Sequence, residues 1–160
     1  FGNALIDARD NGTPEERRAA LDAIPTDGAQ TARLQLIIAS DPEEDRAATL
    51  AALEKLGADT ALSPVYRDLA VLRRVLVGGG DIPVADRRSA LQGIAVPGRP
   101  YRTLAEELLA YLLIEEGKTD EAIAAMAALM QDQEASGPLK ARLGQTVTAL
   151  GGTLPEAPAG

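Results

Sequence analysis

The sequence contains no cysteine and no histidine. These absences exclude disulfides, thiol nucleophiles and cysteine-ligated zinc, and they remove the commonest general base. Aromatic residues make up only 2% of the chain, so strand-forming side chains are too sparse for a sheet of any size. No run of 18 apolar residues is present, so we predict no membrane span within these 160 residues.

Motifs for catalysis or for metal binding are missing as well. The stretch Gly78-Gly79-Gly80-Asp81 lacks the Lys and Ser/Thr of a phosphate-binding loop, and we interpret it as a flexible turn. The acidic run at 41–45 lacks the Gly and Glu that an EF-hand needs. The pairs Glu106-Glu107 and Glu115-Glu116 are neighbours that do not face each other on a helix, so surface solubility explains them. We therefore expect no enzymatic activity, no cofactor and no metal.

The charge of the chain is acidic but unevenly distributed. The net charge of −8 argues against nucleic acid, whose phosphates need clustered Lys and Arg. Residues 61–100 nevertheless carry six Arg against three acidic groups. This excess has two interpretations: the arginines lie on ordinary solvated helix faces, or they form a positive stripe that binds an acidic segment of a partner.

What the chain does contain is Ala, Leu, Ile and Val, within a hydrophobic content of 46%. Ala is the best helix former, so the composition predicts an all-α protein. Pro and Gly place the helix boundaries. Helices are expected at 1–9, 14–24, 29–40, 42–56, 64–77, 83–94 and 138–150, with two more on either side of Gly117. Ser63 and Ser136 precede two of these helices, where capping is the expected role.

A repeat supports this division. Residues 16–24 reappear as residues 86–94, with a shared Arg-Arg and an offset of 70, close to twice a 34-residue repeat. Equivalent leucines occur at positions 21, 53, 91 and 129. The order Ala110, Gly117, Ala122, Met126 has the phasing of a tetratricopeptide repeat.

We therefore predict an α-α superhelix of stacked helical hairpins over residues 1–150, with its first helix truncated. Residues 138–150 form the predicted capping helix, with Leu139, Leu143, Val147 and Leu150 inward. A disordered tail is expected at 151–160.

In such a stack the first helix of each hairpin lines the concave surface. Ala70 and Ala110 are taken as the small residues where the two helices of a hairpin cross. The positions predicted to face the groove are three residues before, one residue after and four residues after each of these alanines. They are Arg67, Val71, Arg74, Glu107, Tyr111 and Ile114, with Glu115 at the edge. A groove of this mixed character suits an extended peptide or a partner's helix. The alternative is an ordinary solvated surface with the real contact elsewhere.

Three segments resemble a known family: Ser63–Val77, Ile94–Met130 and Gly137–Gly152. In order and spacing they are similar to the tetratricopeptide-repeat-like domain of the YfgM family, whereas the first 60 residues fit in pattern only. One departure is Glu106, which stands where the family usually has a large aromatic side chain. The resemblance implies a periplasmic domain on the inner membrane, anchored by one upstream helix. It also implies a non-catalytic partner of the SecYEG translocon or of a periplasmic chaperone.

Two alternatives stay open. A soluble tetratricopeptide adaptor for an unrelated peptide would have the same repeat pattern. Self-association through the first hairpin would give a homo-oligomer. The start at Phe1, without an initiator Met, agrees with an anchor lying upstream.

Overall fold

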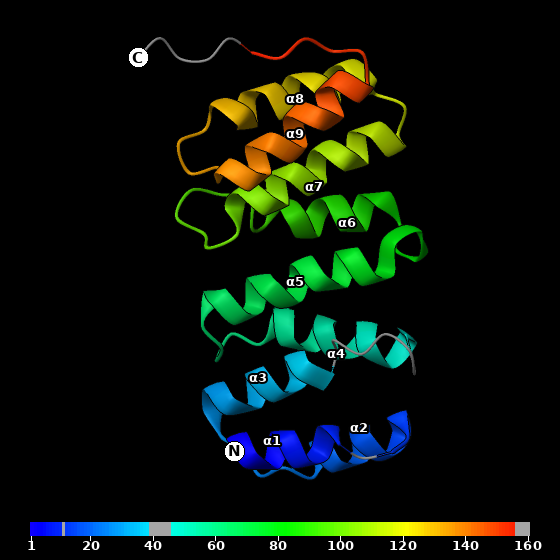
Figure 1. Ribbon diagram of the computed structural model, residues 1–160, viewed down its shortest axis with the longest axis vertical. Helices are drawn as coiled ribbons and strands as arrows, with labels where there is room; N and C mark the ends of the chain where they lie inside the picture. The colour runs from blue at the N-terminus through cyan, green and yellow to red at the C-terminus, as the bar shows by residue number, and fades with distance from the viewer. Residues whose placement is uncertain (11, 39–45, 156–160) are drawn as a thin grey trace. The chain divides into compact units, whose positions relative to one another are not determined.

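The computed structural model describes residues 1–10, 12–38 and 46–155. No strand occurs in these ranges, which confirms the all-α class (Figure 1). The described helices are α1 Gly2–Arg9, α2 Pro14–Asp22, α3 Gly28–Ile38, α4 Arg46–Ala58, α5 Pro64–Gly78, the 3-10 helix η1 Gly79–Asp81, α6 Val84–Gln92, α7 Arg102–Glu115, α8 Thr119–Gln131 and α9 Gly137–Ala149.

Local signals in the sequence account for several helix starts. Thr13 closes a capping box on α2: its Oγ1 accepts from the Glu16 amide at 3.2 Å, and the Glu16 carboxylate accepts from the Thr13 amide at 2.9 Å. Ser136 caps α9 by accepting from the Leu139 amide. Ser63 precedes α5 but makes no capping hydrogen bond with its side chain, so that expectation was wrong. The expected helix start at 41–44 lies outside the described residues.

The 70-residue repeat is present in the backbone. Helices α2 and α6 have the same length and begin 70 residues apart. The four leucines expected to be equivalent (21, 53, 91 and 129) are all buried, one on each of α2, α4, α6 and α8. Sequence periodicity thus identified the buried face of every second helix.

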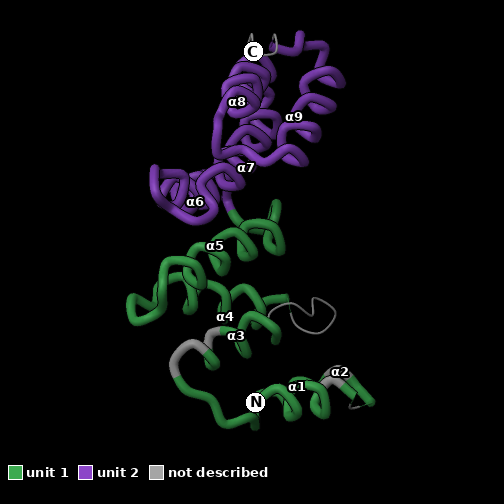
Figure 2. Tube along the Cα trace, turned by 60° about the vertical axis from the view of Figure 1, so that its left-hand side comes forward, with its two compact units in different colours: residues 1–82 green, residues 83–160 purple. Residues whose placement is uncertain are grey.

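The chain divides into two compact units, Phe1–Ile82 and Pro83–Gly160 (Figure 2). In the first unit each helix from α1 to α5 packs against the next. Helix α3 has buried side chains toward both neighbours: Leu34 and Ile38 join the core of α1 and α2, and Leu36 joins that of α4 and α5. Helix α3 is therefore buried on two sides, by Leu34 and Ile38 on one and by Leu36 on the other.

The end of α5, where the glycine-rich turn begins, accepts hydrogen bonds from the side chain of Arg46. Arg46, at the start of α4, donates from Nε to the Val77 carbonyl at 3.1 Å and from Nη2 to the Gly78 carbonyl at 2.8 Å. A Cβ at Gly78 would overlap the side chain of Ile82. Since these carbonyls end α5, Arg46 satisfies acceptors that the helix leaves open. Three of the residues expected to form a turn, Gly79–Asp81, make a short 3-10 helix.

In the second unit α6 packs against α7, α7 against α8, and α8 against α9. Gly117 adopts a φ of +77° between α7 and α8, a conformation that favours glycine, and the next amide returns to the Leu113 carbonyl. The core of α7, α8 and α9 is built from small and aliphatic side chains. Its buried members are Ala110, Met126, Leu129, Ala135, Leu139, Leu143 and Val147.

The chain continues along this core beyond α9. The Gly152 amide donates to the Val147 carbonyl at 2.9 Å, and a Cβ at Gly152 would lie 2.8 Å from Ile123. Leu154 lies against Gly144. Of the expected disordered tail, residues 151–155 therefore have described contacts, and residues 156–160 lie outside the described part.

The predicted stack would pair α5 with α6, and these two helices belong to different compact units, so the superhelical stack stays a prediction. Among the described helices, none is both long enough and apolar enough to cross a lipid bilayer.

Candidate functional site

The predicted site residues of the first unit lie on the side of α5 that meets α4. Arg67, Val71 and Arg74 are all half-buried. A Cβ at Gly57 would lie 3.0 Å from Val71 Cγ2, and Arg74 Nη2 lies 3.6 Å from the carboxylate of Glu54 on α4. Val71 and Arg74 therefore contact a neighbouring helix of their own unit.

The predicted site residues of the second unit are largely engaged by α9 and α6. Glu107 is buried and accepts two hydrogen bonds from Arg142, at 3.1 and 2.8 Å. Ile114 packs against the α7–α9 core, and the Tyr111 hydroxyl lies 3.4 Å from Thr146 Oγ1. Glu115 is bound by Arg87 of α6. The expectation that solubility explains Glu107 was wrong, because this carboxylate is buried in an ion pair.

A more open site lies in the second unit, where α6, α7 and α8 form a groove with a volume of about 430 Å³. Its floor is one stripe of α7, at spacings of three or four residues that keep side chains on one face. One wall comes from α6 and the other from α8. The α7–α8 groove, as we call it, is lined by Arg88, Gln92, Arg102, Glu106, Leu109, Ala110, Leu113, Ala125, Ala128, Leu129 and Asp132.

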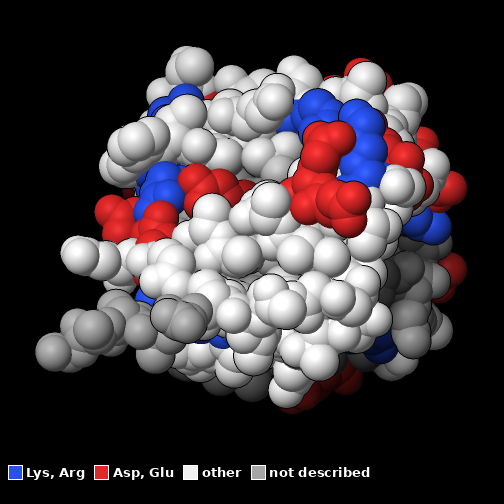
Figure 3. Space-filling view, turned by 90° about the horizontal axis from the view of Figure 1, so that it is seen from above, with Lys and Arg blue, Asp and Glu red and all other residues white. Residues whose placement is uncertain are grey.

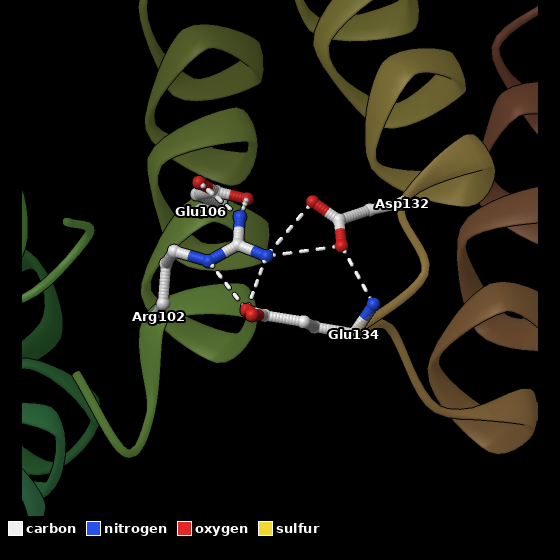
Figure 4. A network of polar contacts seen from close by, with 4 residues as sticks. All are labelled: Arg102, Glu106, Asp132 and Glu134. Carbon is white, nitrogen blue, oxygen red and sulfur yellow. Dashed lines mark hydrogen bonds and ion pairs between the residues drawn. The ribbon is translucent and has the colours of Figure 1, made fainter. Parts of the chain in front are cut away.

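One end of the α7–α8 groove is a cluster of three carboxylates around Arg102 (Figure 4). The guanidinium donates to Glu106 at 2.9 and 3.1 Å, to both oxygens of Asp132 at 2.9 Å, and to Glu134 at 2.9 and 2.6 Å. All three of its nitrogens are used. The Arg102 cluster therefore has a formal net charge of −2, and its guanidinium has no nitrogen left without a partner.

The cluster sets the charge states of its members. A hydrogen bond from the Glu134 amide, followed by the bonds from Arg102, holds the pKa of Asp132 below its ordinary value. The pKa of Arg102 is raised by its bonds to Glu134, Asp132 and Glu106, in that order. Both effects favour the charged forms of Asp132 and Arg102.

The repeated Arg-Arg pair marks the opposite end of α7. Arg87 is buried and binds both oxygens of Glu115, at 2.7 and 2.6 Å. Arg88 binds Glu116 at 2.6 Å, and this hydrogen bond is the leading cause that lowers the pKa of Glu116. Lys118 adds a second cation 3.3 Å from the same carboxylate. The two ends of the α7–α8 groove therefore differ in charge, with the anionic excess at the Arg102 end.

A second hollow lies on the outer face of α9, next to Leu154 and Met130, and its other lining residues are mostly small. Figure 3 shows the face at this end of the second unit, where uncharged residues cover the middle and charged side chains group toward the margins. Among the residues with described positions, no group of three or more acidic side chains could hold a metal ion.

Sequence reasoning did not find the α7–α8 groove, although two signals for it were present. Arg102 and Glu106 form an i,i+4 ion pair that continues into a stripe of apolar residues on α7. Glu106 also occupies the position where the resembled family carries a large aromatic residue. Compared with protein-family models, curated proteins and solved structures, the chain gives no match.

Proposed function

We propose that this protein is a non-catalytic interaction module that binds a segment of a partner protein in the α7–α8 groove. The observation that carries the proposal is an apolar floor with the partly exposed side chains of Leu109 and Leu113, which ends at the Arg102 cluster. Apolar surface that is open to solvent is favourable to cover, and a charged rim gives the covering partner its specificity.

The repeat pattern supports the same role. A single helical hairpin cannot bury its apolar face, so neighbouring hairpins stack. The extended surfaces of such stacks serve protein binding in other helical arrays. The equivalent buried leucines and the glycine turn at Gly117 agree with that architecture.

By its resemblance to the YfgM family, we further propose a membrane-anchored domain on the periplasmic side of the inner membrane, acting beside the SecYEG translocon or a chaperone. The alternative is a soluble adaptor for an unrelated partner. The gene sequence upstream of Phe1 distinguishes them: about 20 apolar residues there would support the anchor, and a cytosolic domain would support the adaptor.

The binding role is tested by blocking the groove. Ala128 is exposed and lines the α7–α8 groove, so Ala128→Phe fills it, whereas Ala124 is exposed on the same helix and does not line it. Full-length protein carrying either substitution is used for affinity capture from solubilised membranes and from the soluble fraction. We expect a partner that Ala124→Phe retains and Ala128→Phe loses. Identical partners for both variants would refute the assignment of the groove.

A further inference from the structure

We propose that the α7–α8 groove receives one amphipathic α-helix of the partner, whose Lys or Arg side chain binds the Arg102 cluster. This inference rests on the proposed binding function and specifies the chemistry of the partner. Shape, backbone hydrogen bonding and charge each contribute a separate argument.

The dimensions of the groove suit a short helix. Its floor runs along α7 from Arg102 to Leu113, a length of about 16 Å at roughly 1.5 Å per residue, which matches about three turns of a partner helix. The α8 wall presents Ala125 and Ala128, both exposed and small. Small side chains let two helix axes approach closely, so the side chains along one face of a partner helix can enter the groove between α6 and α8.

Backbone chemistry favours a helix over an extended strand. The groove is walled by helices whose own amides and carbonyls are used internally, and Gln92 is the uncharged polar side chain among its lining residues. An extended segment would bury amides and carbonyls here without partners, at a cost comparable to a lost hydrogen bond for each group. A helix brings its backbone groups already paired and contributes only side chains.

Charge selects a cation at one end. Arg102 is saturated by its three carboxylates, and the excess of −2 lies on Glu106, Asp132 and Glu134. Two of these carboxylates line the groove, where contact with a partner would remove part of their water. Ion pairs gain strength as the surrounding water is excluded. From Pro83 onward the chain has ten acidic and seven basic residues, so the wider field also favours a basic partner.

The test uses a displayed library of helical peptides, about four turns long and randomised on one face, selected against the intact protein. We expect enriched peptides to carry Lys or Arg at one end of an apolar stripe. Each is then synthesised, and its Kd is measured by fluorescence anisotropy for four variants. Ala128→Phe and Glu134→Gln probe the groove and the charge, and Ala124→Phe and Glu121→Gln, both on α8, are their matched controls.

The expected result is a Kd raised about tenfold or more by Ala128→Phe and about three- to tenfold by Glu134→Gln, with both controls within twofold. Glu134 is well exposed and Glu121 lies about 16 Å along α8 from Asp132, so both Gln variants keep the fold and remove the same charge. Circular dichroism verifies the helix content of each variant.

The other outcomes separate the two proposals. Peptides that require an open groove but show no enrichment of Lys or Arg, and are indifferent to Glu134→Gln, would overturn the cationic anchor and leave the binding function standing. If no peptide is enriched, or if all of them tolerate Ala128→Phe, both the inference and the groove assignment fail.

Discussion

Replacing Arg142 by Met is expected to destabilise the second unit by about 2 kcal/mol, while replacing its partner Glu107 by Leu is expected to cost under about 0.5 kcal/mol. The asymmetry comes from burial: the Glu107 side chain is 8% exposed and that of Arg142 is 50% exposed. Without Arg142 the carboxylate stays buried and loses both of its hydrogen bonds. Without Glu107 the guanidinium remains half in water, which hydrates it.

The magnitude follows from the cost of an unpaired charge. Breaking a fully buried ion pair costs about 3–5 kcal/mol, and the half-exposed side of this pair lets water reach the remaining carboxylate, which lowers the figure to about 2 kcal/mol. The double variant removes both charges and is expected within about 0.5 kcal/mol of the parent protein, because apolar pairs replace ion pairs at little cost.

Urea unfolding followed by far-ultraviolet circular dichroism measures all three variants. Lys140→Met removes the same charge from the same helix and serves as the control, with an expected change below about 0.5 kcal/mol. If Arg142→Met costs no more than Glu107→Leu, then water reaches Glu107 in the folded protein and the reasoning from burial is wrong.

Gly152→Ala places a methyl group 2.8 Å from Ile123 and 3.0 Å from Val147 and is expected to destabilise by about 1–2 kcal/mol, whereas Gly80→Ala meets nothing within 4 Å and should leave Tm unchanged or slightly raised. Thr13→Ala removes the cap of α2 and is expected to cost about 1 kcal/mol, seen as faster hydrogen exchange at the amide of Glu16; unchanged exchange would contradict the capping role. Arg87 lowers the pKa of Glu115, and Arg88 lowers that of Glu116, below the ordinary value of 4.5. These ion pairs therefore stabilise the folded state above pH 4.5, and the stabilisation is lost as the pH falls through the pKa values of the folded protein. The urea midpoint should therefore fall on acidification, and Arg88→Met should flatten the decline; an equally steep decline in the variant would rule out the pair as its source.

Helix positions were predictable from the sequence because the signals for them are local. Capping at Thr13, the turn at Gly117 and the buried leucines depend on residues within one or two turns of the chain. Helix ends differed from expectation by a residue or two, as at α2, which ends at Asp22 rather than Ile24. Caps decide these last residues, and several competing caps fit the same sequence.

The candidate site was less predictable because it depends on which helix covers which face. Helical phase put Glu107 on the predicted groove face of α7, but phase alone does not reveal that Arg142, 35 residues later, covers that face. The α7–α8 groove exists because a face is left uncovered. The side chains of Glu106, Ala125 and Ala128 leave space there that larger apolar residues would fill. Unfilled volume depends on the sum of distant side chains, so no single stretch of sequence reports it.

In both units, arginines form hydrogen bonds with residues about 30 positions away in the sequence. Donor and acceptor are 33 residues apart for Arg33 with Tyr66 and 32 for Arg46 with Gly78; for Arg87 with Glu115, Arg102 with Asp132 and Arg142 with Glu107 they are 28, 30 and 35 apart. Each of these bonds links a helix to the next one along the chain or to the one after that. A helix inserted between two such partners would separate a donor from its acceptor, whereas an insertion outside these spans would leave the bond intact. The arginines therefore limit where the chain can gain or lose a helix without new polar contacts.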